Sequence, residues 1–292
     1  MFNNKSKVNE VVFKGGIGNL LFQFSFFLTL AKYIKGLKID LNSPLSTGLP
    51  QFSRFKEIIS DYPTEIKLNN THGIDKNKKS RYLRLLNEKL LFLRIFKENQ
   101  FEKLNFSIIN NNKNIYIGYW HNYFDYVKDN LSYIEGKIFE INLTEATKVK
   151  VSLIKENDIA IHIRKGDFLS KKNLNVYCNL KKEYFLKAVE HIEKEIKINT
   201  ITIFSNDKNL NLEDYNFNYP TKLFNGQCDD LEELVLISKY QNLVISNSTY
   251  SLWAGYLNYS NKNNLIAPEN WYINGDENTN TSKFFDKKWV RI

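Results

Sequence analysis

Cysteine is scarce in this chain, and its scarcity excludes two kinds of site. Cys178 and Cys228 lie far apart and in no Cys-x-x-Cys pattern. Two isolated cysteines give neither a zinc-binding signature nor a disulfide framework. Such sparse cysteine usage fits a reducing cytoplasm.

Long hydrophobic runs are also missing. The most apolar stretch, residues 20–34, is short for a membrane span and contains Gln23, Ser25, Thr29 and Lys32. It begins too far along the chain, and lacks the small-residue cleavage site, for a signal peptide. We therefore expect a cytoplasmic protein without a membrane anchor.

Neither low hydrophobicity nor a concentrated basic patch is present. The chain has 292 residues, 42% hydrophobic and 14% aromatic, which excludes a disordered chain and allows one large α/β domain or two smaller ones. The net charge of +9 raises the question of nucleic-acid binding. Because the lysines are spread along the chain among acids, we expect no nucleic-acid partner, and a basic RNA-binding protein stays an alternative.

Arginine is rare where lysine is abundant, and one arginine is conspicuous. Arg164 is the only arginine between positions 94 and 291, and it follows the apolar run Ile159–Ile163, which predicts a buried strand. Open α/β sheets bind ligands at strand ends, and the planar guanidinium fork suits a phosphate. We therefore assign Arg164 to phosphate binding and catalysis. A buried Arg164–Asp167 ion pair that only holds a turn is the alternative.

A family resemblance appears at this strand end. The sequence His-Ile-Arg-Lys-Gly-Asp at 162–167 resembles the His-x-Arg-Arg-Gly-Asp motif of the α-1,2-fucosyltransferases and their α-1,6- and protein O-fucosyltransferase relatives. Three other stretches resemble the bacterial α-1,2 family, glycosyltransferase family 11, in the same order. They are residues 15–19 (Gly-Gly-Ile-Gly-Asn), 204–207 (Phe-Ser-Asn-Asp) and 245–253 (Ile-Ser-Asn-Ser-Thr-Tyr-Ser-Leu-Trp). Four short motifs in order make a specific match.

The resemblance implies a GT-B-like α/β fold, with two Rossmann-like domains, parallel sheets and a cleft between them. The second half of the sequence agrees, because strands expected at 159–163, 200–204 and 243–245 alternate with helices expected at 182–196 and 230–239. We expect an acceptor-side α/β domain over 1–148 and a GDP-fucose-binding Rossmann-like domain over 149–292.

The first half opens with a glycine-rich turn between a strand expected at 11–13 and a helix expected at 20–34; another strand is expected at 37–41. Backbone N–H groups at such a helix start bind anions, and we assign Gly16, Gly18 and Asn19 to the donor. Leu21 stands at the third glycine position of a dinucleotide fingerprint, and the P-loop ending is absent. A tight turn without a ligand is the alternative.

Aromatic residues follow a further expected strand at 115–117. Aromatic rings stack on the C–H faces of sugars, and the Gly-Tyr-Trp sequence here also resembles the bacterial family. We assign Tyr119, Trp120 and His121 to the acceptor, with a purely structural histidine as the alternative. The basic, leucine-rich stretch 76–103 predicts an amphipathic helix. That helix either packs on the core or makes a peripheral contact with an anionic inner membrane, where lipid-linked acceptors are presented.

The other donor residues are assigned through the resemblance. Asp207, at the end of the strand expected at 200–204, is implied to accept the N1–H and N2–H groups of guanine, with His162 near the base or ribose. A hydroxyl-rich helix start is implied to bind the diphosphate through Ser246, Asn247, Ser248 and Thr249. Helix capping is the alternative reading of Asp207 and of this segment.

The resemblance implies an inverting transfer of L-fucose from GDP-β-L-fucose to the 2-hydroxyl of a β-galactoside. The acceptor would be a galactose-containing oligosaccharide or lipid-linked glycan, in O-antigen or other surface-glycan synthesis. The candidates for the general base are Asp167, His121 and Asp125. A transferase that uses another nucleotide sugar is the alternative within enzymes.

No metal or other cofactor is expected. Arg164 supplies positive charge at the diphosphate, and no Asp-x-Asp motif stands at an expected strand end. The pair Asp229-Asp230 reads as a helix cap rather than as a metal site.

Overall fold

The computed structural model describes residues 9–41, 51–65, 94–97, 114–121, 124–166, 173, 175–207, 209–226, 228–273 and 281–292. Contacts divide the chain into a first unit, Met1–Ile134, and a second unit, Glu135–Ile292. The division falls inside helix α4 (Phe124–Phe139), ahead of the boundary expected after residue 148.

The first unit contains a five-stranded parallel sheet with the strand order β3-β2-β1-β5-β4. Its strands are β1 (Asn9–Val12), β2 (Leu37–Asp40), β3 (Thr64–Glu65), β4 (Arg94–Lys97) and β5 (Asn114–Ile117). The strands expected at 11–13, 37–41 and 115–117 are confirmed as β1, β2 and β5, with ends that differ by a few residues.

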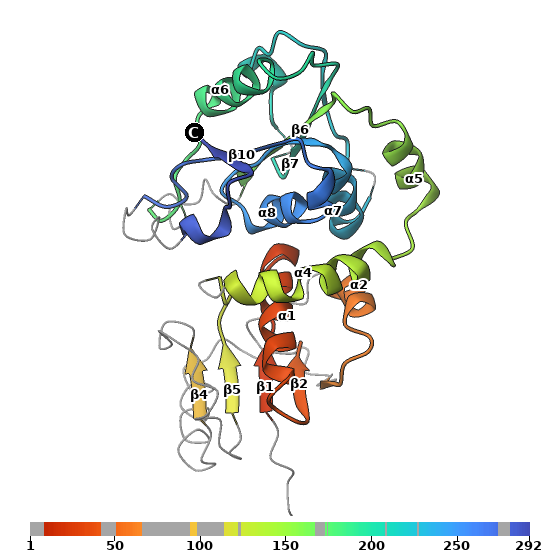
Figure 1. The fold of residues 1–292 in the computed structure, drawn as a ribbon, viewed down its shortest axis with the longest axis vertical. Helices are drawn as coiled ribbons and strands as arrows, with labels where there is room; N and C mark the ends of the chain where they lie inside the picture. Colours follow the sequence, from red (N-terminus) through yellow and green to blue (C-terminus); the bar gives the residue numbers. More distant parts are fainter. Residues whose placement is uncertain are drawn as a thin grey trace, which may run out of the picture. The chain divides into compact units, whose positions relative to one another are not determined.

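Helix α1 (Ile17–Ala31) confirms the helix expected at 20–34 and runs alongside β1 and β2 (Figure 1). It is buried along almost its whole length, and its polar residues are paired. Gln23 bonds both backbone groups of Lys14, at 2.7 and 2.8 Å. Asn130 on α4 donates to the Ser25 carbonyl and to the Thr29 hydroxyl, at 3.1 and 2.9 Å. The polar residues that interrupt the apolar run therefore attach α1 to its neighbours. Helix α2 spans Gln51–Ile58.

The prediction of a helix over 76–103 is wrong for the one segment of this stretch that the structure describes. Arg94–Lys97 form strand β4, which pairs in parallel with β5. Ile95 and Phe96 favour strands locally, and pairing with β5 satisfies the backbone in a way that leucine spacing does not reveal. Residues 66–93 and 98–103 lie outside the described part of the chain.

The second unit contains a six-stranded parallel sheet with the order β11-β10-β9-β6-β7-β8. Its strands are β6 (Ile159–Ile163), β7 (Ile201–Ser205), β8 (Thr221–Leu223), β9 (Asn242–Val244), β10 (Asn264–Ala267) and β11 (Trp289–Arg291). Its helices are α5 (Glu145–Ser152), α6 (Lys182–Ile192), α7 (Asp230–Lys239) and α8 (Thr249–Tyr256), with 3-10 turns at Leu212–Asp214, Tyr259–Asn261 and Ser282–Phe284.

Helices cover both faces of this sheet. Figure 1 shows α6 on one side and α7 and α8 on the other. Every residue of β6 is buried. Ile159, Ile161 and Ile163 pack with Phe185 of α6 in one core cluster, whereas Phe204 of β7 packs on the opposite face, against Tyr240. Burial on both faces explains why β6 is apolar at every position except His162 instead of alternating between polar and apolar residues.

Two parallel sheets with flanking helices confirm the predicted GT-B-like α/β class with two Rossmann-like units. The predicted cleft between the units stays a prediction. In each sheet the strand order reverses next to a central strand, between β1 and β5 in the first unit and between β6 and β9 in the second. The crevice at such a reversal is where open α/β sheets bind ligands.

Candidate functional site

The ends of β6 and β9 form the centre of the candidate donor site. His162 lies on β6 and is 3% exposed. Its Nδ1 atom is 3.0 Å from the Oγ atom of Ser246, which follows β9 and is 84 residues away in the sequence. The fold therefore brings two of the predicted donor residues together at the reversal of strand order.

The His162 ring is neutral at physiological pH. Burial, and after it the nearby positive charge of Arg164, lower its pKa from the usual 6.5 to about 3. A neutral imidazole can act as a hydrogen-bond donor and acceptor toward a ligand but not as a phosphate-binding cation. Arg164, whose charge acts on this ring, is the predicted cation at this strand end.

Arg164 directly follows β6 and is half-buried. Its charge also reaches Asp230, at the start of α7. The pKa of Asp230 is raised by burial and by the neighbouring Asp229, and Arg164 opposes that rise. Asp167, the predicted partner of Arg164, lies outside the described residues.

The segment that leads into α8 is buried and tightly turned. Ser246 and Ser248 are 1% and 7% exposed, and the Ser248 N–H donates to the Ser246 carbonyl at 2.7 Å. The hydroxyl of Ser251 bonds both of their carbonyls. Ser248 stands at the N-cap of α8, yet its side chain makes no cap hydrogen bond. The side chain of Ser248 therefore does not cap the helix, in contrast to the capping alternative. The helix start that includes Thr249 suits an anion.

Asn247 has a supporting role in the described structure. Its buried side-chain amide donates to the carbonyls of Cys178 and Trp271, at 2.8 and 2.9 Å. The residues beside these two, Tyr177 and Tyr272, form an isolated antiparallel bridge with their rings 5.3 Å apart. Asn247 thus holds two loop segments next to the start of α8.

The end of β7 is joined to the loop after β6. The Lys165 N–H donates to the side-chain oxygen of Asn206 at 3.1 Å, and a Cβ at Gly166 would collide with the same side chain. Only glycine fits there without a shift. Asp207 accepts one hydrogen bond from the Asn209 N–H, at 3.0 Å, so its carboxylate also shapes a turn.

Tyr250, in the first turn of α8, also lies at this strand end and was not assigned from the sequence. Its hydroxyl donates to the Asp230 carbonyl at 2.7 Å and lies 3.3 Å from the Glu233 carboxylate. Its ring centroid is 5.5 Å from that of His162. Burial raises the pKa of Glu233 to about 7, with the charge of Asp230 as the second cause. The sequence does not single out Glu233, because it is one of three acidic residues in the first turn of α7.

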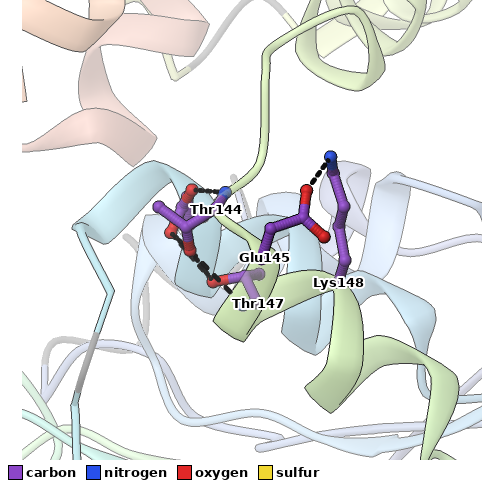
Figure 2. Close-up of polar contacts among 5 residues, drawn as sticks. Thr144, Glu145, Thr147 and Lys148 are labelled. Carbon is purple, nitrogen blue, oxygen red and sulfur yellow. Dashed lines mark hydrogen bonds and ion pairs between the residues drawn. The ribbon is translucent and has the colours of Figure 1, made fainter.

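Helix α7, which carries these acids, is attached by a second buried carboxylate that the sequence analysis missed. Glu232 is 1% exposed. It accepts from the Thr144 N–H at 2.6 Å, from the Thr144 hydroxyl at 3.0 Å and from the Thr147 hydroxyl at 2.8 Å. Figure 2 shows these contacts at the start of α5, beside the separate surface pair of Lys148 and Glu145.

The start of α7 also confirms the predicted helix cap. The side chain of Asp229 accepts from the backbone N–H groups of Leu231 and Glu232, both at 2.9 Å. One acid thus caps α7, while Glu232 attaches the helix to α5.

The first unit has its own cluster at the reversal between β1 and β5. Gly15 has a φ of 88°, and a Cβ there would lie 2.8 Å from the Asn19 amide nitrogen. His121 Nε2 lies 3.1 Å from the Asn19 amide oxygen. Gly16 is the N-cap of α1 without a side-chain cap bond, and Gly18 is buried in its first turn. Of the predicted donor residues, these glycines and Asn19 belong to the first unit.

The predicted acceptor residues separate by exposure. The Trp120 ring is 1% exposed and stacks on Phe26 with centroids 3.7 Å apart, so it packs the core. Tyr119 is 38% exposed, and Lys14 Nζ lies 4.6 Å from its ring centroid. Tyr119 and His121 therefore offer the accessible rings.

Comparison with known proteins identifies the chain at this point. Residues 1–292 match Glycosyl transferase family 11. The chain belongs to this family. The family 11 resemblance of the four motifs is thus confirmed, and a glycosyltransferase is favoured over an RNA-binding protein.

Two relatives from Escherichia coli extend over nearly the whole of this family 11 glycosyltransferase. One is an alpha-1,2-colitosyltransferase, 25% identical over 95% of this chain and 96% of the relative. The other is the O-antigen biosynthesis glycosyltransferase WbnK, 24% identical over 95% and 98%.

Solved structures resemble the chain more distantly. A mutant of Arabidopsis thaliana FUT1 in complex with GDP has a TM-score of 0.44 at 12% identity, covering 87% of this chain and 70% of that one. The E. coli ADP-heptose lps heptosyltransferase II also has a TM-score of 0.44 at 12% identity, covering 98% and 90%.

The described residues of this family 11 glycosyltransferase contain no group of three or more His, Cys, Asp or Glu side chains placed to hold a metal ion. Both cysteines are free thiols. Within the described ranges, no helix has the length and apolar character needed to cross a membrane.

Proposed function

We propose that this family 11 glycosyltransferase moves L-fucose from GDP-β-L-fucose to the 2-hydroxyl of a β-galactoside, with inversion. The observation that carries the proposal is the junction of His162, Arg164 and Ser246 at the reversal of strand order in the second unit. This junction combines a cation, a neutral imidazole and a helix start without a side-chain cap, and the cation and the helix start both suit a diphosphate.

The chemistry assigned to these residues is electrostatic. As the bond from the sugar C1 to the β-phosphate oxygen breaks, GDP gains charge, and Arg164 and the start of α8 stabilise that charge. Groups already oriented toward developing charge stabilise it without reorganisation, and losing one such donor costs about 10²–10³ in rate. Asp207 is assigned to the guanine edge, because a carboxylate accepts its paired N–H groups.

The names of the relatives support the acceptor side of the proposal. One is called an alpha-1,2-transferase and the other an O-antigen glycosyltransferase. We infer an O-antigen or other surface-glycan acceptor, free or lipid-linked, used in the cytoplasm with peripheral contact at the inner membrane. Tyr119 provides an exposed aromatic face for a pyranose.

A second donor sugar is favoured by one observation. The relative that is 25% identical is named for colitose, which is L-fucose without its 3-hydroxyl. A site that hydrogen-bonds a substrate hydroxyl rejects the analogue lacking it by about 10⁴–10⁵, whereas an apolar pocket discriminates far less. The ratio of kcat/KM for GDP-fucose and GDP-colitose therefore separates the two donors.

The deciding experiment is thermal stability with GDP, ADP and UDP at equal concentration, without metal. A ligand at 100 times its Kd adds about 2.7 kcal/mol to the free energy of unfolding. We expect a shift with GDP alone, abolished in Asp207→Ala and retained in Asp214→Ala, an acid in the nearby 3-10 turn. Equal shifts with all three nucleotides, or none, would refute the guanine assignment.

A further inference from the structure

His121 and Asn19 make a hydrogen bond whose direction follows from chemistry. His121 Nε2 lies 3.1 Å from the Asn19 Oδ1 atom, while the amide nitrogen of Asn19 faces Gly15. An amide oxygen only accepts, so the ring must donate through Nε2. The tautomer of a neutral histidine is fixed by the hydrogen bond that one nitrogen makes, and the basic lone pair is then on Nδ1.

The ring of His121 is also held by packing. Phe22 of α1 meets it edge-on, with centroids 4.8 Å apart and planes at 65°. Tyr119 stacks on it at 5.5 Å with planes at 16°. The histidine is half-buried, so these contacts orient a ring that still reaches the surface.

The backbone between Tyr119 and His121 is strained. Trp120 has a φ of 62°, a conformation that bulky side chains rarely adopt. Its indole lies 3.7 Å from the Phe26 ring at an angle of 2°, and this buried stack holds the unusual conformation in place. Strained residues that persist are concentrated at functional sites, and the residues on either side of this one are Tyr119 and His121.

We propose that Asn19 is a positioning residue, which fixes the Nε2–H tautomer of His121 so that Nδ1 takes the proton of the acceptor hydroxyl. The acceptor oxygen forms its bond to the sugar C1 while the bond from C1 to the β-phosphate oxygen breaks, and GDP leaves with that electron pair. His121 becomes an imidazolium and later releases its proton to solvent. This inference rests on the proposed transfer and gives Asn19 a task other than donor binding.

The first test uses nitrogen NMR, which reports the tautomer without turnover. The chain has four histidines, and His121→Gln identifies the signals of the ring in question. Long-range ¹H–¹⁵N spectra at pH 8 should show that Nε2 of His121 is protonated and that Nδ1 carries no proton. In Asn19→Leu both neutral tautomers of His121 should be populated. A protonated Nδ1 in the wild type would overturn the inference.

The second test follows kcat with pH. A carboxylate at position 19 stabilises the protonated ring, so Asn19→Asp should move the acid limb of kcat to higher pH by about one unit. Asn19→Leu should lower kcat by about 10²-fold with a smaller change in acceptor KM. Asn199→Asp, an exposed asparagine in the second unit, adds the same charge as a control and should leave the limb in place.

The outcomes separate the inference from the proposed function. If the wild type turns over GDP-fucose or GDP-colitose but the limb of Asn19→Asp stays in place, the positioning role fails and the function stands. If the wild type turns over neither donor, the proposed function fails and the base role fails with it, whatever the spectra show.

Discussion

His162 Nδ1 lies 3.0 Å from Ser246 Oγ, and this contact joins the ends of the two strands between which the order of the second sheet reverses. One partner is a buried imidazole whose pKa is lowered to about 3 by burial and by Arg164. Because the fold keeps His162 neutral at the expected diphosphate site, the free energy of unfolding should depend on pH, and Arg164 is left to supply positive charge to a ligand.

The first prediction concerns His162 and pH. Below its ordinary pKa of 6.5 the unfolded chain binds a proton at this ring, whereas the folded chain stays neutral down to about pH 3. The free energy of unfolding of the wild type should therefore fall as pH drops from 6.5 toward 3, by at most about 1.4 kcal/mol per pH unit from this group.

Urea unfolding of His162→Asn and the wild type between pH 7 and pH 5 measures that contribution. The stability difference between them should shrink or reverse as pH falls. His191→Asn, on the half-buried C-terminal turn of α6, is the matched control for replacing a histidine. If the free energies of unfolding of His162→Asn and the wild type change in parallel with pH, the claim that His162 is buried in its neutral form would be contradicted.

The second prediction concerns Arg164. A lysine keeps the charge but not the planar fork, so Arg164→Lys should lose nearly as much kcat as Arg164→Ala, about 10²–10³-fold. Arg54→Lys changes an arginine in a surface pair with Glu57, 3.4 Å away, and should keep wild-type kcat. An Arg164→Lys variant that keeps most of the wild-type kcat would mean that Arg164 does not make a bidentate contact with a phosphate.

The third prediction compares buried Glu232 with Glu145, which Figure 2 labels beside Lys148. Glu232→Ala leaves buried donors on Thr144 and Thr147 without their acceptor, which should cost about 3 kcal/mol or more in free energy of unfolding. Glu232→Gln keeps one oxygen acceptor and should cost less.

Glu145→Ala is the control, because its carboxylate pairs with Lys148 at the surface, where such pairs contribute about 1 kcal/mol or less. Urea titrations of the variants give the ranking. Equal losses for Glu232→Ala and Glu145→Ala would show that the buried carboxylate does not hold α7 in place.

The fourth prediction concerns metal. Since a protein cation and a helix start are assigned to the charge of the leaving diphosphate, EDTA should leave turnover of the donor largely intact. The measurement is initial rate before and after chelation, with added Mg²⁺ or Mn²⁺ as the control arm. A reproducible loss that either cation restores would show that the diphosphate is bound through a metal.

Local sequence patterns were sufficient for several elements. Ile159–Ile163 and Asp230–Lys239 have the bounds expected from their apolar run and helical spacing. The order of the four motifs indicated the family that the whole-chain comparison shows. These features depend on residues close together in the chain, where periodicity, turn residues and capping act directly.

Tertiary structure decided the rest. Arg94–Lys97 became a strand because β5 was available to pair with it, and Trp120 entered the core because Phe26 lies within stacking distance. In the sequence Glu232 cannot be distinguished from other acids at a helix start. Only the fold brings it into hydrogen-bonding contact with Thr144, 88 residues away. The sequence by itself determined the class of fold and the family, and it indicated candidate residues for the site. Only the tertiary structure decided which of them meet, because strand order brings distant segments together and no local pattern encodes that order.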